Sequence, residues 1–456
     1  MTVVLKEIAI PQFGVPEARP EIPAATYDKR AATLVERAAS DWVVVYADRE
    51  HLGNIAFLTG FEPRFEEALL LLGRNGERII VTGNESIDYV PVAGLPDVKG
   101  VLAQSLSLMG QDRSQSPDLA AVLRQCGISR GQTIALAGWK YLEPREWDPS
   151  APTFFVPAFI VDALRTVIGT SAPMADATPI LMSPADGMRA IVDADEIAQL
   201  EWGSARSSAA VWRIVEGARA GMSELECAAL MGYAGEPLNC HVMMSGASAP
   251  DPVIGLRSPS SRKIKEGDGV TTAIGYWGGL SCRAGLMSDG DEAFLEKAIC
   301  YFDSLRAWYE TIDIGVAGKQ VASAVETTLA RAGLRPALNP GHLISHDEWM
   351  HSPLRSGSED VIRSGMVCQV DIIPAPMEPG QALNCEDGVV IADEALRADI
   401  ARLHPEVYAR MQARRDFMSD VIGVTLKDCI LPLSSTPLYF PPFWNKPDHV
   451  LVVEKQ

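Results

Sequence analysis

The sequence has little of what marks proteins that bind nucleic acid or membranes. It carries 40 basic against 59 acidic residues, a formal net charge of −19. A chain this acidic repels phosphate backbones and anionic lipids. We therefore expect a small-molecule substrate, with cationic or zwitterionic ligands favoured, and no nucleic-acid or membrane partner. The same charge is also typical of a solvated surface that aids solubility.

Cysteines and long apolar runs are scarce as well. The eight cysteines among 456 residues form no Cys-x-x-Cys pair, which favours reduced structural thiols over a disulfide framework or a zinc site. The longest apolar stretches, such as 68–72 and 154–161, fall short of the roughly 18–20 residues that cross a bilayer. The amino-terminal segment also lacks the pattern of a signal peptide. We expect a cytoplasmic protein.

The order of strand and helix signals predicts two domains. Residues 1–185 alternate the two signals, as in an α/β domain: a buried strand at 41–46, a hairpin formed by 67–73 and 78–82, and a short helix at 118–126. Turn-forming residues follow near 183–187. A new helix then begins at Asp193, with Glu196 placed as in a capping box. The second predicted domain covers 186–456.

This second domain contains a weak internal repeat. A helix with apolar residues from Ile197 to Val215 leads into 220–226 and a second helix. Another, from Phe294 to Trp308, leads into 314–320 and a second helix. In each copy Glu226 or Gln320 stands where a side chain completes a helix cap. Two such units, each followed by strand-rich sequence, predict a duplicated α+β domain, although unrelated helix pairs can show the same pattern.

Polar residues able to do chemistry concentrate in the last third of the chain. His342, His346 and His351 lie within ten residues, too irregularly spaced for one helix face. Asp371 sits inside an apolar strand, where a carboxylate needs a cation, a hydrogen-bond donor or water beside it. Glu386 opens the next strand signal, and Asp387, beside a glycine, is more typical of a turn.

At this point the chain resembles the pita-bread peptidase superfamily of methionine aminopeptidase, aminopeptidase P, prolidase and creatinase. Residues 54–61 resemble the creatinase/prolidase amino-terminal domain, and 194–197 with 221–226 resemble the entry to the catalytic domain. The tail segments 431–434 and 441–443 resemble those of aminopeptidase-P-like and creatinase-like members. The resemblance spans nearly the whole chain. It implies an α+β catalytic domain with a pseudo-twofold repeat, preceded by an α/β domain.

The resemblance implies a metal site that this chain has only in part. Members that bind metal hold two divalent ions with two Asp, one His and two Glu, because adjacent dications need anionic ligands. His342 matches the His, while Asp371 and Glu386 stand at the two Glu positions. The first Asp falls on Ala273, and the second on Arg283 or, with a shift of one residue, on Ala284. We therefore expect no metal cofactor.

Creatinase resembles this case, since it shares the fold without the metal set and hydrolyses a C–N bond of a cationic guanidino compound. Its catalytic His is missing here, because Leu256 or Arg257 takes the corresponding place. His342 is then the candidate acid–base group, with a pKa that suits proton transfer at neutral pH. His346 and His351 are secondary candidates for substrate binding, or are structural, and Arg257 is a further candidate for substrate binding.

Two arginines complete the predicted site. Arg283 would face Asp371 and Glu386, either as the cationic wall of a pocket for a zwitterion or as a buried ion pair that replaces the metal charge. In creatinase-like dimers the amino-terminal domain of one chain contributes to the partner's site. The resemblance thus implies a homodimer in which Arg64, or its neighbours Glu62 and Phe65, reaches that site.

Three functions follow as hypotheses. The first is a metal-independent, creatinase-like hydrolase of a C–N bond in a small amino-acid-like, guanidino or amide substrate. In it His342 is the acid–base residue, and Asp371, Glu386 and Arg283 orient the substrate. The second is a metal-dependent Xaa-Pro aminopeptidase or prolidase whose missing ligands come from elsewhere in the chain. The third is a binding module that keeps the fold without turnover. The sequence does not name the substrate.

Overall fold

A computed structural model describes residues 2–148 and 150–454 and divides them into two compact units. One unit is residues 22–190. The other joins residues 191–454 to the first segment of the chain, 2–21. That segment was predicted to belong to the amino-terminal domain. It belongs instead to the carboxyl-terminal unit, because β1 (Thr2–Glu7) pairs antiparallel with β17 (His449–Glu454).

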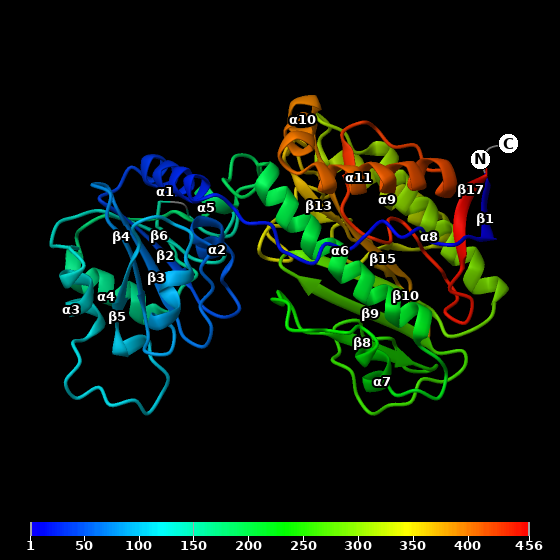
Figure 1. Cartoon of the computed structure of the whole chain (residues 1–456), viewed down its shortest axis with the longest axis horizontal. Coiled ribbons are helices and arrows are strands. Elements are labelled where there is room, and N and C mark those ends of the chain that lie inside the picture. The colour runs from blue at the N-terminus through cyan, green and yellow to red at the C-terminus, as the bar shows by residue number, and fades with distance from the viewer. Residues whose placement is uncertain (1, 149, 455–456) are drawn as a thin grey trace. The chain divides into compact units, whose positions relative to one another are not determined.

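A six-stranded mixed sheet forms the centre of unit 22–190 (Figure 1). Strand β2 pairs antiparallel with β3 and parallel with β6, and β3 and β4 form the predicted hairpin. The strand order is β5-β4-β3-β2-β6-β7, with bounds Trp42–Ala47 (β2), Ala68–Gly73 (β3), Arg78–Thr82 (β4), Lys99–Leu102 (β5), Ile134–Ala137 (β6) and Met174–Asp176 (β7).

Helices cover both faces of this sheet. The predicted short helix is α3 (Leu119–Gln125), which begins where the Asp118 carboxylate accepts a hydrogen bond from the Ala121 N–H. It packs with α4 (Ala158–Ile168) against alternate side chains of β2 in one apolar cluster. The remaining helices are α1 (Ala24–Ala38), α2 (Gly53–Thr59) and α5 (Thr178–Met182). Period-2 alternation in the strands and an apolar face on each helix thus account for this core.

An antiparallel sheet forms the centre of the carboxyl-terminal unit. Its strand order is β12-β13-β15-β10-β9-β8, with β16 also paired to β15. The bounds are Met243–Ala247 (β8), Gly269–Tyr276 (β9), Gly279–Leu286 (β10), His342–Leu343 (β12), Val367–Val370 (β13), Asn384–Ile391 (β15) and Ile430–Pro432 (β16). A separate two-stranded ribbon pairs β11 (Arg335–Pro336) with β14 (Pro374–Ala375).

Long helices pack on this sheet. Helix α6 (Ala194–Gly217) begins at Asp193, whose carboxylate accepts from the Glu196 N–H as predicted, and it crosses β9 and β10 (Figure 1). Helix α8 (Glu292–Thr311) packs on α9 (Gly318–Leu329). The other helical segments are α7 (Glu224–Ala229), α10 (Glu394–Leu403), α11 (Pro405–Asp416) and a π-helical turn at Phe417–Ile422.

The two predicted helix caps are both present. At α7 the Ser223 hydroxyl accepts from the Glu226 N–H, and the Glu226 carboxylate accepts from the Ser223 N–H. At α9 the Gln320 side chain accepts from the Ala317 N–H. Gly221 and Gly315 precede these caps with positive φ, a conformation that favours glycine. The repeat seen in the sequence is therefore a repeat of local structure.

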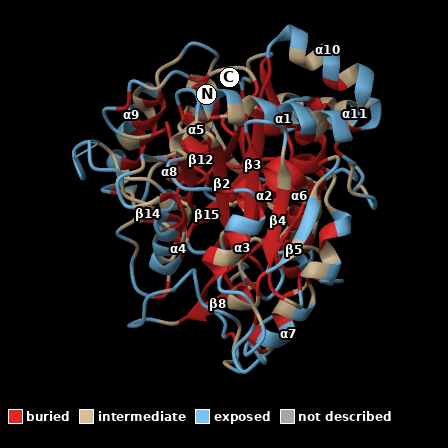
Figure 2. Cartoon of the chain, turned by 90° about the vertical axis from the view of Figure 1, so that its left-hand side faces the viewer, coloured by how far each residue is buried: buried red, intermediate tan, exposed pale blue. Residues whose placement is uncertain are grey.

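Burial follows the sheets (Figure 2): the strands are largely buried, whereas α10 and α11 expose their outer faces. All eight cysteines are free thiols, in agreement with the sequence. Among the helices of the described ranges, none combines the length and apolar character needed to cross a bilayer.

Candidate functional site

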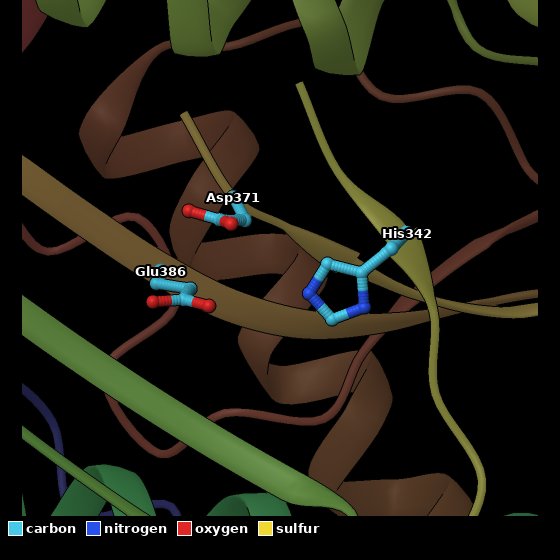
Figure 3. A group of neighbouring side chains, drawn as sticks. All are labelled: His342, Asp371 and Glu386. Atoms are coloured by element: carbon cyan, nitrogen blue, oxygen red, sulfur yellow. The ribbon is translucent and has the colours of Figure 1, made fainter. Parts of the chain in front are cut away.

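Three side chains from neighbouring strands converge at one end of the larger sheet. His342 lies in β12, Asp371 directly follows β13, and Glu386 lies in β15. Each offers a ligand atom, and these atoms all lie within 4.8 Å of one another. Figure 3 shows the imidazole of His342 turned toward the two carboxylates. The sequence placed these residues in one site, and the strand order β12-β13-β15 brings them together.

Gly341 allows β12 to approach β13 closely at this point. It has φ +119°, and a Cβ there would lie 2.5 Å from the carbonyl oxygen of Gln369. His342 then pairs with Gln369 across the two strands. The glycine before His342 is thus required by the backbone, which explains why the two residues occur together.

A fourth residue, Glu348, was not singled out in the sequence. Its carboxylate oxygen lies 3.1 Å from Nε2 of His342, and Trp349 stacks on the same imidazole at 4.2 Å between ring centroids. The His342 ring is fully buried, whereas the Glu348 side chain is 24% exposed. Glu348 lies in the histidine-rich segment of the sequence, which was a signal that it belongs to the site. Its contact with His342 depends on the turn between residues 343 and 351, which only the structure reveals.

The site is buried and yet contains several acidic side chains. Burial raises the pKa of Asp371 to about 7, opposed by the charge of His342 and reinforced by that of Glu348. Burial and then the charge of Asp371 raise the pKa of Glu386 well above its usual range. Burial alone would lower the pKa of His342, but Glu348 and Asp371 raise it above its usual value. Three carboxyl groups around one imidazole favour bound protons or a cationic guest.

Arg283 does not face this cluster, so the prediction of a cationic wall is wrong. Cys282, the residue before Arg283, pairs with Glu386. Because side chains alternate between the two faces of a strand, Arg283 does not share the face of Glu386. Arg283 points to the opposite face, where its guanidinium lies 3.0 Å from both carboxylate oxygens of Asp387. It also donates to the carbonyl oxygens of Thr436 and Tyr439.

Asp387 is correspondingly a strand residue and not the turn residue that its neighbouring glycine suggested. It lies inside β15, is buried, and accepts a further hydrogen bond from the Leu438 N–H. The ion pair of Arg283 and Asp387 thus ties the sheet to the carboxyl-terminal segment. Both roles predicted for Arg283 had it facing Asp371 and Glu386; its buried ion pair is instead formed with Asp387 on the opposite face.

The contacts of the other residues predicted to bind substrate are as follows. His346 is buried, with Nδ1 3.4 Å from Glu196 and its ring edge-on to Trp277. His351 is half-buried, and its carbonyl oxygen accepts from the Leu343 N–H. Arg257 is exposed, and its carbonyl accepts from the Met244 N–H. Arg64 belongs to the other unit, where it hydrogen bonds to the Tyr89 hydroxyl.

The positions expected to carry the two Asp ligands of a metal pair offer no carboxylate on this face of the sheet. Ala273 of β9 pairs directly with Cys282 of β10, which in turn pairs with Glu386 of β15. The two residues nearest Glu386 across these strands therefore carry a methyl group and a thiol. Ala284, the alternative position for the second Asp, shares the face of Cys282 by alternation. A single ion does fit, because His342, Asp371 and Glu386 offer three converging ligand atoms.

Solved structures share this fold. The chain superposes on a dipeptidase PepE from Mycobacterium ulcerans with a TM-score of 0.59 and 21% identity, covering 82% of this chain and 95% of that one. For an X-Pro aminopeptidase from Thermotoga maritima the TM-score is 0.62 and the sequence identity 16%, and the superposition covers 80% of this chain and 95% of that one. For a prolidase from Pyrococcus horikoshii the TM-score is 0.61 and the sequence identity 16%, with the same coverage of 80% and 95%.

The chain therefore has the pita-bread fold of the prolidases and aminopeptidases P, as predicted. No protein-family model matches the sequence. No curated protein matches it either. The similarity to known proteins is thus carried by the fold, and the activity has to be inferred from the site itself.

Proposed function

We propose that this protein is a hydrolase of a C–N bond in a small cationic or zwitterionic substrate and that it acts without a pair of divalent ions. One observation carries the proposal. His342, Asp371 and Glu386 converge in a buried cluster on the face where the flanking strands offer Ala273 and Cys282 in place of carboxylates. The solved structures that share the fold are named as peptidases, which supports the reaction class.

The carboxylates bind the substrate in this proposal. When both are ionised, Asp371 and Glu386 carry like charges close together at low exposure, which is unfavourable unless a cation lies between them. A protonated amine or a guanidinium supplies that charge and donates hydrogen bonds to both carboxylates. The two acids therefore orient the substrate, and Arg283, held on the far face by Asp387, does not touch it.

His342 carries the proton. In its neutral form His342 acts as a general base and takes a proton from a water molecule whose oxygen forms the new bond to carbon. It then returns this proton to the nitrogen as the C–N bond breaks, so that one water is consumed and the residue is regenerated. Glu348, 3.1 Å from Nε2, stabilises the imidazolium formed between the two steps.

Replacement of His342 tests the proposal. We expect His342→Ala to lower kcat by at least about 10²-fold on any small amide or guanidino substrate that the wild type hydrolyses, because the proton carrier is removed. Substrates are sought in a panel of cationic amides, guanidino acids and Xaa-Pro dipeptides. The matched control is His404→Ala, which removes a half-buried histidine paired with Asp195. Unchanged turnover in His342→Ala would overturn the proposal.

A hydrolase with a single divalent ion is the second candidate, and the convergence of three ligand atoms favours it. His342, Asp371 and Glu386 would hold the ion. An ion there supplies a Lewis acid and lowers the pKa of a bound water. In this case the carbonyl oxygen of Leu343, 3.3 Å from Nδ1, keeps the imidazole oriented through its other nitrogen.

Metal content separates the two candidates. Protein purified without chelator, then dialysed against Zn²⁺, Mn²⁺ or Co²⁺, is analysed by plasma mass spectrometry. The leading proposal expects less than one tightly bound ion per chain and activity that survives EDTA. The second expects one ion that is lost in Glu386→Gln. Two ions per chain would contradict both, because Ala273 and Cys282 provide no anionic ligand beside Glu386.

A further inference from the structure

The acidic cluster continues directly into an apolar surface, which we call the apolar wall. It consists of Met243, Ala273, Leu280 and Cys282, with Cys240 packed against them. Met243 pairs with Ala273 and Ala273 with Cys282, and Cys282 in turn pairs with Glu386. Since directly paired residues place their side chains on the same face, one row runs across four strands from methionine to glutamate.

Residual exposure indicates that the wall borders space that water can enter. Ala273, Leu280 and Cys282 each keep 5% of their surface, Met243 keeps 6%, and Asp371 and Glu386 keep 5% and 6%. In the same strands, Thr272 and Ile274 keep 0% and Arg283 keeps 1%. The small residual exposure thus occurs at every second residue of the strands, on the face that carries Asp371 and Glu386. The accessible space therefore lies on that face.

The thiols of the wall stay neutral. Burial, and then the charge of Glu386, raises the pKa of Cys282 well above its usual value. Burial, followed by the charges of Glu348 and Glu386, raises the pKa of Cys240 to about 12. Cys282 is a buried free thiol and Cys240 packs against the same apolar cluster, so both behave as small apolar side chains. The wall then offers no charge to a ligand, in contrast to the carboxylates at its edge.

We propose that the site selects a cation that carries a compact alkyl group next to its charge, with the charge on Asp371 and Glu386 and the alkyl group on the apolar wall. The inference rests on the proposed function and narrows its substrate class. A bare cation would satisfy the acids but leave the wall in contact with water. An alkyl group of two or three carbons covers Ala273 and Cys282 and removes apolar surface from water.

Binding of an alkylguanidinium series tests the inference on the full chain. Dissociation constants for guanidinium, methylguanidinium, ethylguanidinium and propylguanidinium are measured by calorimetry in EDTA. We expect each added methylene to tighten binding about threefold to fourfold. In Ala273→Val, which fills the space above the wall, the gain should be lost for propylguanidinium while guanidinium binds as in the wild type.

A second variant and a matched control make the test independent of folding defects. Ala273→Asp places a carboxylate in the wall and should tighten guanidinium while abolishing the preference for longer alkyl groups. Ala395→Asp introduces the same charge at an exposed position of α10 and should change neither. Equal affinity across the alkylguanidinium series would overturn this inference but not the proposed function. A preference for longer alkyl groups that survives in Ala273→Val would do the same. If none of the cations binds, the cation site of the proposed function fails with it.

Discussion

Replacing Arg283 with leucine is expected to destabilise the carboxyl-terminal unit by about 3–5 kcal/mol. The guanidinium is 1% exposed and lies 3.0 Å from both oxygens of a carboxylate, Asp387, that is 3% exposed. Burial alone would lower the pKa of Arg283, but the charge of Asp387 raises it above its usual value. Without the arginine, Asp387 stays buried with an uncompensated charge. The free energy of unfolding from urea titration measures the loss.

The double variant Arg283→Met/Asp387→Leu should recover much of this loss, because replacing both partners by apolar groups removes the buried charge as well. Arg402→Leu is the matched control. Its ion pair with Asp399 is exposed on α10, and such pairs contribute at most about 1 kcal/mol. If Arg283→Leu unfolds no more easily than Arg402→Leu, the ion pair does not hold β10 and β15 to the carboxyl-terminal segment.

Asp371 is expected to make the metal-free, ligand-free protein less stable as the pH rises. Its pKa is raised to about 7 in the folded chain, against about 3.9 when unfolded. The folded state therefore binds more protons between these values, so the free energy of unfolding falls as the pH rises from about 4 to 7. Glu386 and His342, whose pKa values are also raised, act in the same direction.

Asp371→Asn isolates the contribution of this residue. The amide has almost the same shape and no charge, so the variant should equal the wild type near pH 4 and exceed its stability at pH 8. Urea unfolding at half-unit pH steps in EDTA gives the curve. Asp289→Asn, at an exposed loop position, should follow the wild type throughout. Parallel curves for Asp371→Asn and wild type would show that the carboxyl is ionised without penalty in the folded protein.

Local signals in the sequence were sufficient for many elements of the fold. The caps at Asp118, Asp193 and Ser223 involve contacts within four residues, so the chain encodes them where they occur. The hairpin of β3 and β4 follows from two apolar runs around Asn75 and Gly76. The placement of residues 2–21 could not be predicted in this way, because β1 pairs with β17 at the opposite end of the chain.

The candidate site was predictable in its members and not in its orientation. His342, Asp371 and Glu386 were selected by residue type and by resemblance, and they converge. Arg283 was placed on the wrong face, since a shift of one residue in register exchanges the two faces of a strand. Glu348 was missed because its contact with His342 depends on the path of the turn between them.

By itself, the sequence determined an acidic chain with few cysteines, a two-part organisation, the fold class and three of the polar residues of the site. Such features depend on composition, on local capping and on apolar periodicity, all of which act over a few residues. Only the tertiary structure decided that Arg283 neutralises Asp387, that Glu348 contacts His342, and that an apolar wall lies beside the acids. These are contacts between distant segments, and the register of four antiparallel strands fixes which side chains meet on each face.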